Sequence, residues 1–153
     1  MKALILYSTI YGHNLEMSQF IHQSLLPYAD WMQIDNFDFT TLADYDLLVL
    51  CPCTYGEGYL QPRDEAFQNF LKKSRLPRLK YLIVAAGDRD FGPSDFANAA
   101  NIFQFRLKAA GAQPVSGPIK YDFADFLHTE QQLKNLFMQD PLLRSASHEA
   151  AVS

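Results

Sequence analysis

Three short segments of the chain, 3–7, 47–51 and 82–86, consist of consecutive apolar residues. Apolar runs of this length, without alternating polar positions, are typical of parallel strands whose two faces are both covered by helices. The three segments therefore predict the central strands of a parallel sheet.

Between and after these runs, apolar residues recur at every third or fourth position, which gives a helix one apolar stripe. The stripe of the first helix, which begins at about residue 13, comprises Met17, Phe20, Ile21, Ser24 and Leu25. Three further helices are predicted at 63–74, 95–110 and 129–138. Gly111 follows the third of these and marks its C-terminus, because glycine adopts a positive φ at little cost.

Two weaker apolar segments, 31–35 and 115–121, predict the remaining strands, and Gly117 and Pro118 interrupt the second. The stretch 37–45 is too short for a long helix, so this crossover is reduced. Strands and helices otherwise alternate, which favours an open parallel sheet with right-handed crossovers and helices on both faces. The fold expected is a doubly wound α/β domain with a five-stranded parallel sheet.

The chain of 153 residues has the length of one domain, which buries about 70% of the surface of its unfolded chain. We assign residues 1–140 to this domain. After Asp140 and Pro141 the sequence loses its period and becomes small and polar. Residues 141–153 are therefore expected to form a flexible C-terminal tail.

The formal net charge of −4, without a visible cluster of lysine or arginine, argues against nucleic acid as a partner. No apolar segment is long enough for a membrane span. The two cysteines, Cys51 and Cys53, are too close for an easy disulfide and too few for a structural zinc site, so we expect a reducing, cytoplasmic setting. Neither a metal-binding set nor a catalytic residue is expected.

A glycine-bearing loop follows each of the three apolar runs, at 8–14, 52–58 and 87–92. In an open parallel sheet, ligands bind outside the carboxyl ends of the strands, where these loops would converge. The first loop opens a helix, whose first N–H groups and dipole favour an anion. It has hydroxyl and amide donors but no Lys or Arg, and no nucleoside triphosphate or dinucleotide motif, so a phosphate monoester fits it best. Taken alone, the loop is equally compatible with an ordinary turn.

The second and third loops each carry an aromatic side chain. Tyr55 precedes Gly56, and Phe91 follows Gly87 and Asp88. Such rings can stack on a flat ligand. Together the loops describe a slot with a phosphate anchor at one end and aromatic walls at the other.

These loops, in this order, resemble the cofactor loops of the short-chain flavodoxins. The segments that carry the resemblance are Ser8-Thr9-Ile10-Tyr11-Gly12-His13-Asn14, Cys53-Thr54-Tyr55-Gly56-Glu57-Gly58, and Gly87-Asp88 with Phe91. The resemblance extends from Met1 to about Met138. It implies a flavodoxin-like sheet with the strand order 2-1-3-4-5 and FMN as the cofactor.

By this resemblance the first loop holds the FMN phosphate, while Tyr55 and Phe91 enclose the isoalloxazine ring. The full set of cofactor-binding residues that it implies is Ser8, Thr9, Ile10, Tyr11, Gly12, His13, Asn14, Cys53, Thr54, Tyr55, Gly56, Glu57, Gly87, Asp88 and Phe91. The implied function is the transfer of single electrons between redox proteins, a reductase donor and an acceptor enzyme. Such a protein is a monomeric electron carrier more than an enzyme.

Two other functions remain as alternatives. The third loop, 87–92, also resembles that of the small flavoproteins that activate manganese ribonucleotide reductases. A phosphoacceptor switch of the same fold is the other alternative. The lack of an acidic pair at Ser8 and Thr9 argues against that switch.

Overall fold

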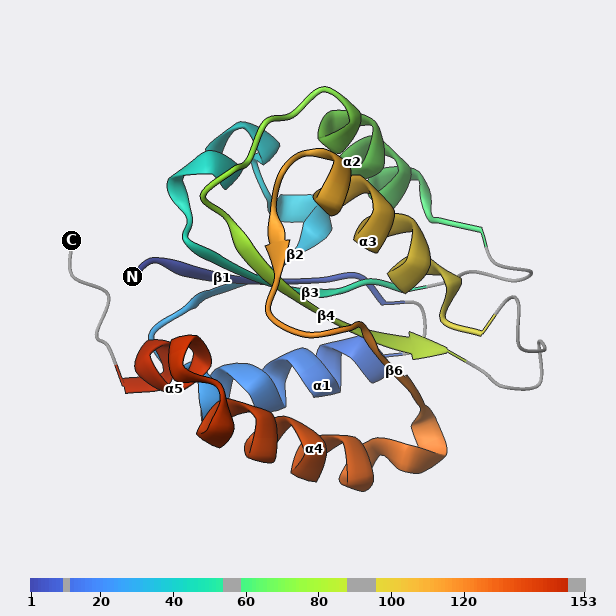
Figure 1. Ribbon diagram of the computed structural model, residues 1–153. Helices are drawn as coiled ribbons and strands as arrows, with labels where there is room; N and C mark the ends of the chain where they lie inside the picture. The colour runs from blue at the N-terminus through green and yellow to red at the C-terminus, as the bar shows by residue number, and fades with distance from the viewer. Residues whose placement is uncertain (10–11, 54–58, 88–95, 149–153) are drawn as a thin grey trace.

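The computed structural model describes residues 1–9, 12–53, 59–87 and 96–148. Its strands pair in parallel in the order β2-β1-β3-β4-β5, and β6 also pairs with β4 (Figure 1). The strands are β1 (Ala3–Tyr7), β2 (Asp30–Gln33), β3 (Leu47–Cys51), β4 (Lys80–Gly87), β5 (Gln113–Pro114) and β6 (Ile119–Asp122). The predicted order 2-1-3-4-5 is therefore confirmed.

The predicted fifth strand is divided into two pieces, β5 and β6. The first pairs with Lys80 and Tyr81 at the start of β4, and the second pairs with residues 84–87 at its end. Gly117 and Pro118 lie between the two pieces. Proline has no N–H to donate to a neighbouring strand, so pairing along β4 is interrupted there and then resumes.

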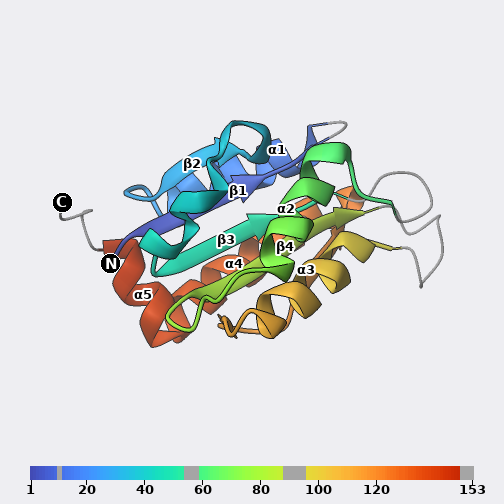
Figure 2. The same cartoon turned by 90° about the horizontal axis from the view of Figure 1, so that it is seen from above.

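Helices cover both faces of the sheet, as predicted (Figures 1 and 2). On one face lie α2 (Pro62–Lys72) and α3 (Asn98–Ala109), and on the other lie α1 (His13–Phe20), α4 (Phe126–Gln139) and α5 (Pro141–His148). Side chains of a strand alternate between the two faces. Accordingly, Leu4 and Leu6 join the core under α2 and α3, whereas Ile5 joins the core under α1 and α4.

The first helix continues beyond α1 as a π-helical turn, Ile21–Leu25. Met17, Ile21 and Leu25 are buried, whereas Ser24, which the predicted stripe includes, is exposed. A π-helical turn is wider than an α-helical one, so the buried positions here are four residues apart.

Residues 141–148 form helix α5, so the prediction of a tail is wrong for this part of the chain. The Asp140 carboxylate accepts the N–H of Leu143 at 3.0 Å and caps the helix, while Pro141 occupies its first position. Leu143 and Ala146 are buried in the core shared with α1 and α4. These two buried apolar positions lie among small and polar residues, so the sequence gives only a weak helical pattern here. Residues 149–153 lie outside the described residues, and for them the tail stays a prediction.

Within the described ranges, no helix combines the length and the apolar character that crossing a membrane requires.

Candidate functional site

The parallel strands β1, β3, β4 and β6 end at the same edge of the sheet (Figure 1). Seven of the predicted site residues are described and lie at this edge: Ser8, Thr9, Gly12, His13, Asn14, Cys53 and Gly87. The other eight lie outside the described residues: Ile10, Tyr11, Thr54, Tyr55, Gly56, Glu57, Asp88 and Phe91. Cys53 forms a β-bridge with Ala86, so the second and third loops begin next to one another.

Asn14, in the first turn of α1, is buried, and its amide joins four groups at this edge. Its Nδ2 donates to the carbonyl oxygens of Ser8, at 3.0 Å, and Pro52, at 2.6 Å. Its Oδ1 accepts from the N–H of Ala86 and the hydroxyl of Tyr121, both at 3.1 Å. An amide has two N–H donors and two acceptor lone pairs, so all are in use. The side chain ties together the ends of four strands and has no donor left for a ligand.

The hydroxyls of Ser8 and Thr9 also hold the chain in place. Ser8 is 1% exposed, and its Oγ accepts the N–H of Cys53 at 3.0 Å. The Oγ1 of Thr9 accepts the N–H of Gly12 at 2.7 Å, and Gln61 donates to the Thr9 carbonyl oxygen at 3.5 Å. Each hydroxyl retains its own hydrogen for donation, but both oxygens first serve to fix the loop.

Gly12 is the N-cap of α1 and has a φ of +88°, the left-handed conformation that favours glycine. A Cβ atom at this position would meet nothing within 4 Å, so the conformation, not lack of space, requires glycine. No side-chain hydrogen bond caps the helix at this residue. In any α-helix, the first N–H groups cannot be paired by the helix's own carbonyl groups. Such donors, with the helix dipole behind them, fit a phosphate group.

Gly87, at the start of the third loop, packs directly on Ala97. A Cβ atom at Gly87 would lie 2.5 Å from the backbone nitrogen of Ala97, which no real side chain tolerates. Ala97 itself has a φ of 49°, the one positive value at a non-glycine residue in the described part of the chain. Gly87 and Ala97, on either side of the segment 88–95, are thus held close together.

Asp64, in the first turn of α2, is the one fully buried carboxylate of the described chain. Neither of its oxygens makes a hydrogen bond there. Burial raises the pKa of Asp64 to about 6; the neighbouring Ser8 hydroxyl acts in the opposite direction, and the charge of Asp35 adds to the rise. An acid in the first turn of a helix is common because of the helix dipole, so the sequence did not single Asp64 out.

Tyr121, at the end of β6, is a second residue that the sequence analysis missed. The single hydrogen of its hydroxyl is shared between Asn14 Oδ1 at 3.1 Å and the carbonyl oxygen of His13 at 3.2 Å, and burial raises its pKa. The ring of His13 packs against Phe123 with 4.2 Å between centroids. A tyrosine at the end of the last strand resembles any core aromatic in a sequence, because its hydrogen-bond partners lie more than 100 residues away.

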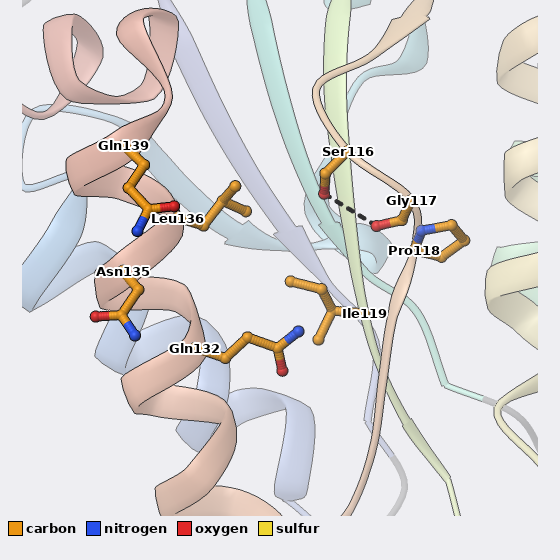
Figure 3. Close-up of a pocket in the computed structure, with 8 residues that line it drawn as sticks. All are labelled: Ser116, Gly117, Pro118, Ile119, Gln132, Asn135, Leu136 and Gln139. Atoms are coloured by element: carbon orange, nitrogen blue, oxygen red, sulfur yellow. Dashed lines mark hydrogen bonds between the residues drawn. The ribbon is translucent and has the colours of Figure 1, made fainter.

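A separate hollow lies between α4 and the connection from β5 to β6 (Figure 3). Amide and hydroxyl groups line it beside Ile119 and Leu136, and none of its lining residues is titratable: the polar ones are Ser116, Gln132, Asn135 and Gln139. The hollow therefore offers neutral hydrogen-bonding groups, with no acid or base among its lining residues. In the ranges that the structure covers, no cluster of His, Cys, Asp or Glu could hold a metal ion.

Comparison with known proteins agrees with the fold. The family model for flavodoxin matches residues 5–136. A probable flavodoxin 1 of Bacillus subtilis is 29% identical over 126 residues, which cover 80% of this chain and 78% of that protein. Oxidised flavodoxin 2 of Bacillus cereus has a TM-score of 0.80 at 25% identity, covering 91% of this chain and 99% of its own. A short-chain flavodoxin associated with a bacterial microcompartment has a TM-score of 0.79 at 24% identity, covering 92% and 99%. The chain belongs to the flavodoxin family of FMN-binding electron-transfer proteins.

Proposed function

We propose that this protein carries single electrons between redox partner proteins, with FMN bound across the three loops at the carboxyl edge of the sheet. The hydrogen bonds of Asn14 are the observation that carries this proposal. They fix the ends of β1, β3, β4 and β6 relative to one another without any contribution from a ligand. A site that is already ordered loses less conformational entropy when a ligand binds.

The phosphate of FMN would occupy loop 8–14. The left-handed conformation of Gly12 and the start of α1 support this placement, because the first turn of a helix directs backbone N–H groups and the positive end of the helix dipole toward an anion. Thr9, Gly12 and His13 are the described residues that we place around the phosphate. Ser8 and Asn14 would hold the backbone of this loop in place rather than contact the phosphate, since both side chains are buried.

The isoalloxazine ring would lie between Tyr55 and Phe91, with Gly56, Glu57 and Asp88 near its polar edge. Cys53 and Gly87, at the starts of these two loops, support this arrangement, because the Cys53–Ala86 bridge brings the starts of the loops side by side. FMN, when bound, supplies the one-electron chemistry. The chain binds the cofactor and orients it.

The partners we propose are a reductase donor and an acceptor enzyme, which would meet a monomer of this protein at the same edge. Two aromatic side chains near it are well exposed, Tyr59 at 67% and Phe123 at 50%. Tyr59 directly follows the second loop, and Phe123 packs on His13. Exposed aromatic groups are common at the centres of protein interfaces.

Stepwise anaerobic reduction of the FMN-loaded protein, followed by visible absorption, tests the electron-carrier role. Two well-separated one-electron steps are expected. Reduction in a single two-electron step would contradict a one-electron carrier. A protein that does not bind added FMN would contradict the cofactor assignment itself.

The placement of the phosphate has its own test. Gly12→Ala forces a side chain into the left-handed region, at a cost of about 1 to 2 kcal/mol, and should weaken FMN binding by about tenfold. Binding of riboflavin, which lacks the phosphate, should change much less. Gly117→Ala is the matched control, because its Cβ also meets nothing within 4 Å. Equal losses for FMN and riboflavin would argue against phosphate binding at this loop.

A further inference from the structure

The start of α2 lies directly against the phosphate loop. Gln61, which precedes α2, donates to the carbonyl oxygen of Thr9 at 3.5 Å, and the Asp64 carboxyl group lies beside the Ser8 hydroxyl. Asp64 is 0% exposed, and its two oxygens are without a hydrogen bond in the described structure. Asp64 is therefore a buried acid without a hydrogen-bond partner, and it lies next to the first residues of the proposed phosphate-binding loop.

Among the residues that the structure describes, no cation stabilises the charged form of Asp64. On the same helix, Arg63 donates to the carbonyl oxygen of Phe37 at 2.9 Å and lies over the ring of Phe39 at 4.1 Å. The Arg106 guanidinium of α3, the other helix on this face, lies 5.2 Å from the ring of its neighbour Phe105.

The charges that do bear on Asp64 are unfavourable to its ionised form. Asp35, on the 3-10 turn that follows β2, has the same charge as ionised Asp64. Loop 8–14 contains no Lys or Arg, and His13 is its one titratable side chain with a described position.

We propose that Asp64 takes up one proton from solvent when the phosphate of FMN enters loop 8–14, so that the cofactor is held in front of a neutral carboxylic acid. This inference rests on the proposed function. A phosphate dianion and a buried carboxylate repel each other strongly where the effective dielectric constant is low. Protonation removes this repulsion: the carboxylate and one solvent proton become the acid, and no other bond changes. The neutral acid is also less costly to bury than the ion.

The protonation equilibrium of the free protein makes this step measurable. Burial raises the pKa of Asp64 to about 6, the Ser8 hydroxyl partly opposes the rise, and Asp35 adds to it. Near pH 7 the free protein therefore holds Asp64 mostly ionised and has to acquire the proton on binding. Above pH 6, affinity for FMN should fall by up to about tenfold per pH unit relative to a protein that cannot ionise at this position.

Titration calorimetry of FMN in buffers with different ionisation enthalpies measures the protons taken up. At pH 7.5, about one and a half units above the pKa of Asp64 in the free protein, wild type should take up close to one more proton per FMN than Asp64→Asn. Protons exchanged by groups remote from Asp64 are common to both proteins and cancel in the difference. With riboflavin the two proteins should give equal proton counts. Glu65→Gln, which removes an exposed carboxylate from the same helical turn, should behave as wild type.

Equal proton counts for wild type and Asp64→Asn with FMN would overturn this inference and leave the proposed function intact. Failure of the wild type to bind FMN would overturn both. If Asp64→Asn does not fold, the 13C shift of the Asp64 carboxyl carbon in wild type gives the same answer. It should report a carboxylate in the free protein and a carboxylic acid in the FMN complex at pH 7.5, and an unchanged carboxylate would reject the proposal.

Discussion

Asn14 and Asp64 occupy comparable positions in the fold but differ in their hydrogen bonding. Each lies in the first turn of a helix, is fully buried and contacts Ser8, Asn14 from the α1 face of the sheet and Asp64 from the α2 face. Asn14 makes four hydrogen bonds, whereas Asp64 makes none in the described part of the chain.

A neutral amide with all its partners stabilises one arrangement of the backbone. A buried carboxylate without partners lowers stability whenever it is charged. The difference indicates that Asn14 is a structural tie, while Asp64 is a group whose charge can change during function.

The largest effect on stability is expected from removing the hydrogen bonds of the Asn14 side chain. Asn14→Ala removes the hydrogen-bond partner of two carbonyl oxygens, one backbone N–H and the Tyr121 hydroxyl. It should lower the free energy of unfolding by about 3 to 5 kcal/mol. Urea denaturation of the FMN-free protein measures it. Asn101→Ala, at an exposed position where Nδ2 donates to Asn98, should cost less than about 0.5 kcal/mol. Similar losses in both variants would show that the Asn14 network contributes little.

Neutralising Asp64 should have the opposite sign. Because the folded-state pKa is raised from 3.8 to about 6, the folded protein holds a proton that the unfolded chain releases, and wild-type stability falls as pH rises through this range. Asp64→Asn should remove that fall and be more stable than wild type above pH 6, by about 2 to 3 kcal/mol. Urea denaturation at pH 4 to 8 tests this.

Glu65→Gln, the exposed neighbour, should leave the pH profile of stability unchanged. A difference between wild type and Asp64→Asn that stays constant from pH 4 to 8 would mean that Asp64 does not titrate in this range.

Ser8 links the two regions and can sharpen the comparison. Ser8→Ala removes the Oγ that accepts the Cys53 N–H and also the hydroxyl that lowers the pKa of Asp64. Stability should fall by about 1 to 2 kcal/mol, and the Asp64 titration should move to higher pH. Ser116→Ala, whose Oγ donates to Gly117 at an exposed turn, is the control. An unmoved titration would show that the Ser8 hydroxyl does not act on Asp64.

The smallest effect concerns the outer partner of Asn14. Tyr121→Phe removes a hydroxyl that donates to Asn14 Oδ1 and to the His13 carbonyl oxygen, and should cost about 1 kcal/mol in thermal or urea unfolding. Tyr28→Phe, at a residue that is 52% exposed, should cost almost nothing. If both variants unfold alike, the Tyr121 hydroxyl does not contribute to the network.

Local pattern was sufficient for most of the fold. The runs 3–7 and 47–51 became β1 and β3 with the same bounds, because a strand covered on both faces needs apolar residues at every position. The C-terminal segment is harder to predict because its apolar positions are few. Its one clear helix signal is the start at Asp140 and Pro141, where a capping carboxylate precedes a proline.

The succession of strands and helices and the position of the three loops can be predicted from the chain alone, since these depend on residues close together along it. Which polar side chains face inward depends on tertiary contacts. Asn14 forms a hydrogen bond with Tyr121, which is distant in the sequence. Asp64 is shielded from solvent by the helices and strands that pack around it. Burial and partners of this kind come from contacts between distant segments, so the same residue types would read as ordinary loop and helix-start residues in any sequence.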